Sequence, residues 1–415
     1  MTSTEQSFLH DWQSRQVIPG GNSTLAKSTD RLARGHSPLA ARTANGAYFT
    51  DLDDNRWLDC EMAMGTAMWG HSRSEINQAV IEQLLRGHAF STPNERETEL
   101  AELLLRRFPT FDQARFTKSG AEAVTAAVRV ARAATGKKMI LATAYHGWLD
   151  WSAYGYYDKQ TRALGITDHT AADVLYNNGT VEAVLAVIKR ANSDLAAVVI
   201  CPALWIADEL NAIRSATQKA GCVLIFDEVT SGMRTGKTAT AGRADVWPDL
   251  LCLSKGLANG LPLAVLLGPR HLMRLTLEVK MSSAHAGEAL ALAAAIEGEH
   301  LLQARDHWPS WEAPATAMID HLNQALQKLQ LTTFLEVAGD YSSFSIKTLH
   351  CDNFWTDPFR HHLITSLAKA HIFSKGYFVF SDAHTPAEIA HAQEATLTAI
   401  SSYTAHLSTH TKGDT

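Results

Sequence analysis

Short apolar runs alternate with helical patterns through the middle of this chain, and this alternation constrains the fold more than any other feature. Runs this short, with helices between them, are typical of parallel strands buried on both faces of a sheet. We therefore predict an α/β domain built on a mostly parallel central sheet. The runs are MILAT (139–143), AAVVI (196–200), CVLIF (222–226), LLCL (250–253) and LAVLL (263–267).

Different patterns on either side of this region predict a second, smaller domain. GAYFTDLDDNRWLDC (46–60) alternates apolar and polar residues around Asp53, Asp54 and Asn55, which predicts an antiparallel hairpin. Amphipathic helices are predicted at 74–86 and 95–107. Beyond residue 298, long helices accompany the strand-like SSFSIKTL and GYFVF. We expect an N-terminal segment (1–50), a large domain (51–297) and a C-terminal small domain (298–415), with the N- and C-terminal parts forming the smaller α+β domain.

Composition favours small-molecule chemistry over the binding of nucleic acid or membranes. The net charge is −6 without any basic run, and nowhere do 18 uninterrupted apolar residues occur. The polar start MTSTEQSFLHDW and five scattered cysteines are typical of a protein in a reducing compartment, so we expect a cytoplasmic location. The 19 histidines include one adjacent pair, in RHHL (360–363), and neither HExxH nor CxxC occurs. No metal site is therefore expected.

Two charged residues follow neighbouring apolar runs. Asp227 ends CVLIFD, and Lys255 comes directly after LLCLS. Because open α/β sheets build their sites at the carboxyl ends of strands, we expect both side chains to enter one crevice. The same region holds GMRTGKT (232–238), which resembles a phosphate loop, but only three residues separate its glycines where a P-loop has four. A nucleoside triphosphatase is therefore disfavoured.

A well-marked helix begins after Ser119. Ser119 and Glu122 form a capping box, and Gly136 stands where a C-cap glycine is expected. A capping box needs no ligand, but the backbone N–H groups of Ser119, Gly120 and Ala121 also form a ready phosphate site. An aspartate, a lysine and a phosphate-binding helix start are together what pyridoxal 5′-phosphate requires.

Four motifs resemble the class-III, fold-type I pyridoxal-phosphate aminotransferases, particularly the glutamate-1-semialdehyde aminomutase-like group. They are KSGAEA (118–123), AYHGWLDW (144–151), FDEVTSGMR (226–234) and LSKGLANGLP (253–262), within a resemblance that covers about residues 15–300. The resemblance implies a large domain with a smaller one, and a homodimer with shared active sites. It also implies small-molecule substrates: an amino donor and a carbonyl acceptor.

The same resemblance assigns roles to individual residues. Lys255 would form a Schiff base with the cofactor and then move protons as a general base. Asp227 would pair with the pyridinium nitrogen and keep the ring an electron sink. Val229 would pack on one ring face and Tyr145 on the other, with His146 beside it. The phosphate would lie at Ser119, Gly120 and Ala121.

The chain departs from the family pattern in ways that bear on the substrate. Ala121 replaces a hydroxyl residue of the phosphate motif. Ala284 aligns with a threonine that a partner subunit usually supplies, and Ser282 or Ser283 is the nearest substitute. Ala26, followed by Lys27, stands in place of the arginine that binds the substrate carboxylate in the semialdehyde mutases. Cys201-Pro202 replaces the usual Glu-Pro after AAVVI.

We therefore hypothesise an aminotransferase acting on an aldehyde or ketone that need not carry an α-carboxylate, such as a sugar-derived carbonyl. The pattern KGLANG with HAGEALALAAA is similar to class-III enzymes of polysaccharide or nucleotide-sugar pathways, which implies a role in biosynthesis. Candidate substrate residues are Lys27, Trp148 and Trp151, with Tyr154 and Tyr156 as further pocket candidates. An aminomutase of the glutamate-1-semialdehyde type, a racemase, a decarboxylase or an inactive protein of the same fold remain alternatives.

Overall fold

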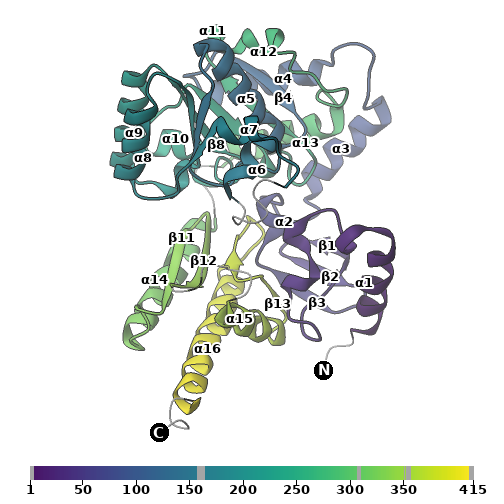
Figure 1. Cartoon of the computed structure of the whole chain (residues 1–415). Coiled ribbons are helices and arrows are strands. Elements are labelled where there is room, and N and C mark those ends of the chain that lie inside the picture. Colours follow the sequence, from purple (N-terminus) through teal and green to yellow (C-terminus); the bar gives the residue numbers. More distant parts are fainter. Residues whose placement is uncertain (1–3, 157–163, 306–309, 350, 352–356, 411–415) are drawn as a thin grey trace. The chain divides into compact units, whose positions relative to one another are not determined.

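The chain forms two compact units (Figure 1). The structure, a computed structural model, describes residues 4–156, 164–305, 310–349, 351 and 357–410, without the side chains of 154–156 and 405–410. The large unit is Ser74–Trp308, and the small unit combines Met1–Arg73 with Pro309–Thr415. No helix in the described part of the chain is long and apolar enough to cross a membrane.

A seven-stranded sheet forms the centre of the large unit, in the order β4-β10-β9-β8-β7-β5-β6. The five strands from β9 to β6 are parallel, and β10 pairs antiparallel with both β9 and β4. The mostly parallel sheet predicted from the apolar runs is therefore confirmed. Its strands are β4 (Gln113–Thr117), β5 (Met139–Ala142), β6 (Val174–Tyr176), β7 (Leu195–Ile200), β8 (Val223–Glu228), β9 (Leu250–Leu253) and β10 (Ala264–Gly268).

Helices of the large unit begin and end largely where the sequence indicates. The two predicted amphipathic helices are α3 (Ser74–Arg86) and α4 (Glu95–Arg107). The capping-box helix is α5 (Gly120–Thr135), with Ser119 as its N-cap and Gly136 in the left-handed conformation at its C-cap. The remaining helical segments are α6 (Asp150–Tyr156), α7 (Asp168–Ala172), α8 (Val181–Ala191), η4 (Pro202–Leu204), α9 (Ala207–Ala220), α10 (Ala239–Arg243), η5 (Lys255–Ala258), α11 (Arg270–Met273), α12 (Leu275–Glu278) and α13 (Ala289–Gln303).

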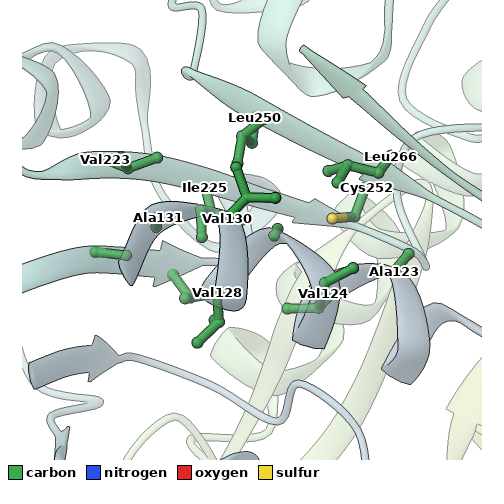
Figure 2. Close-up of a cluster of buried hydrophobic side chains, with 14 of the residues drawn as sticks. Ala123, Val124, Val128, Val130, Ala131, Val223, Ile225, Leu250, Cys252 and Leu266 are labelled. Atoms are coloured by element: carbon green, nitrogen blue, oxygen red, sulfur yellow. The ribbon is translucent and has the colours of Figure 1, made fainter. Parts of the chain in front are cut away.

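The main core of the large unit lies between α5 and the sheet. Figure 2 shows α5 side chains such as Val124 and Val128 together with Ile225, Leu250 and Cys252 of the strands. Each of these side chains is almost completely removed from solvent. Burial of one such valine or leucine is worth about 1.5–3 kcal/mol, so this contact fixes α5, and with it the helix start at Ser119, against the sheet.

The small unit joins the two ends of the chain through β-pairing. Strand β13 (Ile372–Phe373) pairs in parallel with β3 (Arg56–Asp59), which completes the sheet β1-β2-β3-β13. The predicted hairpin is confirmed as β2 (Tyr48–Asp51) and β3, with Asp54 at a φ of 63° in its turn. Because β3 pairs with a C-terminal strand, this hairpin belongs to the small unit, whereas the expected boundary at 50/51 assigned most of it to the large domain. The expected boundary at 297/298 falls inside α13.

A second sheet of the small unit has the order β11-β12-β14 and contains the strand-like segments predicted near the C-terminus. The sequence expectation that the N- and C-terminal parts form an α+β unit is confirmed. The remaining elements are α1 (Glu5–Val17), η1 (Pro19–Gly21), η2 (Leu25–Lys27), η3 (Thr29–Arg31), β1 (Ala41–Asn45), α2 (Met62–Gly65), α14 (Glu312–Lys328), β11 (Leu335–Asp340), β12 (Ser343–Thr348), α15 (Pro358–Lys369), β14 (Tyr377–Phe378) and α16 (Pro386–His410).

The turn α2 has an unusual backbone. Met62, Ala63 and Met64 have φ angles of 46°, 51° and 64°, all in the left-handed region. This conformation costs about 1–2 kcal/mol for each residue with a side chain. The turn is anchored by Asp59, which accepts the N–H groups of Glu61 and Met62 at 2.9 Å each. Strain of this kind persists only where the surrounding contacts impose it.

Candidate functional site

Asp227, near the end of β8, and Lys255, two residues after β9, lie at the same edge of the large sheet. Asp227 is the next-to-last residue of β8 and is aligned with Cys252 of β9, three residues before Lys255. The Asp227 side chain is buried, and Lys255, the first residue of η5, is partly exposed. The expected juxtaposition follows from the parallel pairing, since it carries both chain segments out of the sheet on one side.

His146 lies in the loop after β5 and holds the Asp227 carboxylate. Its Nδ1 is 2.8 Å from Oδ2 of Asp227, and the backbone N–H of Val229 donates to Oδ1 at 3.1 Å. Both carboxylate oxygens therefore have a fixed position. The His146 ring is fully enclosed, and its Nε2 has no hydrogen-bond partner among the described residues.

The indole ring of Trp151 stacks on the imidazole ring of His146. The two rings are parallel within 11°, with their centroids 6.3 Å apart. Trp151 is 5% exposed, belongs to the main core, and donates its indole N–H to Thr125 at 2.8 Å. The structure differs here from the expectation that Trp151 lines a substrate pocket: its indole packs inward because α5 offers both apolar surface and an acceptor for the N–H group.

The start of α5 packs directly against the strand that carries Asp227. A Cβ atom added to Gly120 would lie 2.5 Å from Cγ2 of Val229, so only glycine fits there. A Cβ atom added to Gly147, which follows His146, would lie 2.6 Å from Cβ of Ala121. The segments 119–121, 145–147 and 227–229, far apart in the sequence, are thus in contact.

The helix start leaves two N–H groups for a ligand. The N–H of Glu122 donates to Oγ of Ser119, while Oε2 of Glu122 accepts the N–H groups of Lys118 and Ser119. The N–H groups of Gly120 and Ala121 have no acceptor within the described residues, as is usual for the first turn of a helix. These two groups and the positive end of the helix favour an anion. The Ser119 hydroxyl, in contrast, is engaged in the capping box.

Lys255 combines a strained backbone with a side chain directed to the same site. Its φ is 50°, and its ammonium donates to the hydroxyl of Thr230 at 2.8 Å. Burial lowers the pKa of the Lys255 ammonium, the charge of Asp227 acts in the opposite direction, and Arg234 lowers it further. In the segment after Lys255, Asn259 and Gly260 have a positive φ, whereas Gly256 does not. The conformational strain at this turn lies in the lysine itself, as functional sites often show.

The other expected site residues lie in less enclosed positions. Tyr145 is 43% exposed and Trp148 is 72% exposed. Ser283 is exposed in the segment between α12 and α13, where it lines a groove of about 1000 Å³ together with Thr117 and Glu122. Lys27 is an exposed residue of η2 in the small unit. The side chains of Tyr154 and Tyr156 lie outside the described part of the structure.

Two neighbours of the site were not selected from the sequence as site residues. The hydroxyl of Thr230 accepts a hydrogen bond from the Lys255 ammonium. The thiol of Cys201, the residue after β7, lies within 4.8 Å of donor atoms of His146 and Asp227. A signal existed for Cys201, since it follows a parallel strand at the edge that Asp227 shares. No pattern marked Thr230, because a hydroxyl residue after a strand is common in any turn.

The chain is similar to known proteins over most of its length. Residues 31–340 match the family described as Aminotransferase class-III. A glutamate-1-semialdehyde 2,1-aminomutase 2 from Exiguobacterium sp. is 29% identical over 374 residues, which are 85% of this chain and 84% of the relative. A 2'-deamino-2'-hydroxyneamine transaminase from Streptomyces kanamyceticus is 32% identical over 275 residues, which are 66% of this chain and 69% of the relative.

A solved structure shows the same fold over almost the whole chain. The FumI protein of Sphingopyxis sp. MTA144, determined in its PLP internal aldimine form, superposes with a TM-score of 0.85 at 26% identity and covers 96% of both chains. The fold class predicted from the sequence, that of the fold-type I pyridoxal-phosphate enzymes, is therefore confirmed.

Proposed function

Because this chain belongs to the class-III aminotransferase family, we propose that it transfers an amino group from an amino donor to an aldehyde or ketone that need not carry an α-carboxylate. The family uses pyridoxal phosphate, and the chain is accordingly a pyridoxal-phosphate-dependent enzyme. When bound, this cofactor supplies an aldehyde that captures amines and a ring that accepts the electron pair left on the substrate carbon. The roles of individual residues follow from the contacts described above.

The observation that carries the proposal is the convergence of three different groups at one place. Asp227 is a buried carboxylate held in position, Lys255 is an amine just after the next strand, and the α5 start offers two N–H groups. Gly120 and Gly147 have room only for hydrogen, so the backbone approaches closely on both sides. A carboxylate, an amine and an anion site together fit a phosphorylated pyridine aldehyde.

We assign the ring end of the cofactor to Asp227, positioned by His146. A carboxylate near the ring nitrogen keeps a proton there, and the His146 hydrogen bond holds the acceptor oxygen in place. Val229 is adjacent to this carboxylate and to Gly120, so it forms one face of the ring site. Tyr145, exposed beside His146, is assigned to the other face. The phosphate is assigned to the N–H groups of Gly120 and Ala121, with Ser119 as the N-cap.

Lys255 is the amine that we assign to covalent attachment and proton transfer. A lysine acts as a base only when it is partly neutral, and burial moves the pKa of this ammonium in the required direction. Thr230 accepts a hydrogen bond from the ammonium and so directs the side chain in the resting state.

The proposed attachment can be tested on the purified protein. Incubation with pyridoxal phosphate and then borohydride should add one cofactor to the peptide that contains Lys255, as mass spectrometry would show. Lys255→Ala should take up no covalent label, while Lys237→Ala, which removes an exposed lysine, should be labelled like the wild type. A protein that shows no label on Lys255 would refute the assignment.

The acceptor is proposed to be a sugar-derived carbonyl. Support comes from the Streptomyces kanamyceticus relative, which is named 2'-deamino-2'-hydroxyneamine transaminase, and from Ala26 with Lys27 in place of the expected arginine. A lysine binds a carboxylate less specifically than the bidentate arginine fork. A panel of keto-sugars, sugar aldehydes, α-keto acids and glutamate-1-semialdehyde should show the fastest turnover with a sugar substrate.

The second candidate is an aminomutase. It is favoured by the Exiguobacterium relative, which aligns over more of the chain and is named for glutamate-1-semialdehyde. Turnover with that compound alone, and with no sugar carbonyl, would decide for this candidate. A racemase or decarboxylase would reveal itself by product formation from an amino acid without any carbonyl acceptor.

We further propose that the enzyme is a cytoplasmic homodimer with a biosynthetic role. The exposed segment around Ser283 would then serve the phosphate site of a second copy, in the manner expected from the sequence. Light scattering of the purified protein tests the dimer. Ser283→Ala should weaken pyridoxal phosphate binding if the hydroxyl takes part.

A further inference from the structure

Three metal-ligand side chains meet at the edge of the large sheet. His146 follows β5, Cys201 follows β7, and Asp227 is the next-to-last residue of β8, and these three strands are neighbours in the sheet. One donor atom from each residue lies within 4.8 Å of the donor atoms of the other two. The spacing of histidines in the sequence does not predict this metal site, because the three residues come together only through the order of the strands.

The donor set matches the preferences of zinc. Imidazole, thiolate and carboxylate are its usual ligands, at distances of about 2.0–2.3 Å from the ion. Ligand atoms around such an ion lie roughly 3–4 Å apart, and the three donor atoms lie within 4.8 Å of one another. His146 Nδ1 and Asp227 Oδ2, now 2.8 Å apart and joined through a proton, would have to move slightly apart to admit the ion.

The His146 ring can present a lone pair to an ion at this position. A neutral imidazole carries its proton on one nitrogen and a lone pair on the other. Nε2 is buried and has no hydrogen-bond partner in the described part of the chain. No donor therefore requires Nε2 to keep its lone pair. The ring is therefore free to carry its proton on Nε2 and to bind a cation through Nδ1. Cys201 has a free thiol, and the residue is partly exposed.

We propose that the cofactor-free protein binds one zinc ion through His146, Cys201 and Asp227, and that zinc and pyridoxal phosphate exclude each other. On binding, the thiol of Cys201 releases its proton to solvent and the thiolate, the imidazole and the carboxylate each form one bond to the ion. No electron is transferred. The mutual exclusion rests on the proposed function, in which pyridoxal phosphate also uses Asp227. The metal site itself does not depend on the proposed function.

The direct test is a zinc titration of the cofactor-free, full-length chain against a chromophoric zinc indicator. The wild type should bind one zinc ion. Cys201→Ser should weaken binding by at least about tenfold. Cys222→Ser removes a buried thiol that directly precedes β8 and should leave zinc affinity unchanged. Saturation with pyridoxal phosphate should abolish zinc binding at this site.

A second measurement uses only the wild type, so it does not depend on the folding of a variant. Zinc should protect Cys201 from alkylation, while Cys351, the other partly exposed thiol, should react at an unchanged rate, as mass spectrometry of the two peptides would show. Absence of zinc binding, or zinc binding that neither depends on Cys201 nor protects it, would overturn the proposal.

The metal site and the proposed function can fail separately. If zinc binds through Cys201 but Lys255 takes up no pyridoxal phosphate, the site stands and the assigned function fails. If Lys255 is labelled and zinc does not bind, only the metal site is refuted. If both ligands bind at the same time, the shared use of Asp227 is refuted.

Discussion

Nδ1 of His146 lies 2.8 Å from Oδ2 of Asp227, and this contact joins the loop after β5 to the end of β8. The ring is itself fixed by Trp151, which is anchored to Thr125 of α5. A carboxylate assigned to the cofactor is thus positioned through side chains that reach into the main core. Its orientation depends on the packing of the large unit and not on the local strand alone.

The first prediction concerns this contact. His146→Phe keeps the ring shape against Trp151 but removes the donor to Asp227. A hydrogen bond to a charged group is worth about 1.5–3 kcal/mol, so we expect the dissociation constant for pyridoxal phosphate to rise roughly 10- to 100-fold. His146→Asn retains an N–H group near the position of Nδ1 and should show a smaller effect. Equal cofactor affinity of the wild type and His146→Phe, measured by absorbance titration, would contradict the assignment.

The second prediction concerns the pH dependence of covalent attachment. Only the neutral amine reacts with the cofactor aldehyde, so the rate of attachment should rise with pH until Lys255 is deprotonated. Since burial lowers the pKa of Lys255 below its ordinary value of 10.5, the plateau should be reached at a lower pH than for a free lysine derivative. The charge of Asp227 opposes this shift, so Asp227→Asn should move the profile to still lower pH. Stopped-flow absorbance of the cofactor-free protein measures both profiles, and a shift of the variant to higher pH would show that the sign is wrong.

A third prediction tests the close approach between α5 and β8. Gly120→Ala places a methyl group 2.5 Å from Cγ2 of Val229, and overpacking of this kind costs about 1–3 kcal/mol. We expect a lower melting temperature and weaker cofactor binding. Val229→Ala removes the two nearest atoms, so the double variant should recover part of both losses. If the double variant is no better than Gly120→Ala, the clash with Val229 is not the cause.

The fourth prediction concerns the left-handed turn of the small unit. Ala63 has a φ of 51°, which disfavours any side chain, whereas glycine adopts this conformation without strain. After allowance for the greater freedom of glycine in the unfolded chain, Ala63→Gly should stabilise the protein by about 0.5–1 kcal/mol. Ala317→Gly, in the exposed face of α14, should destabilise it by about 1 kcal/mol. Urea midpoints provide the comparison, and a destabilising Ala63→Gly would mean that the turn carries no strain.

Local chemistry made much of the fold predictable. The start and end of α5 follow from Ser119, Glu122 and Gly136, because capping depends on residues within one turn of each other. The apolar runs predicted the strands because a strand that is buried on both faces of a sheet has no position for a polar side chain. The placement of Asp227 and Lys255 at one edge of the sheet could also be predicted, because parallel strands end at the same edge.

What the sequence by itself determined was therefore the set of elements and the edge at which the chemistry lies. Tertiary structure decided which side chains meet there: that His146 binds Asp227, that Cys201 lies beside both, and that Trp151 is buried behind them. It also decided that Lys255 has a left-handed backbone. The physical reason is the strand order: β5, β7, β8 and β9 are neighbours in the sheet although other elements separate them along the chain. Contacts between their ends therefore depend on packing that no local pattern encodes.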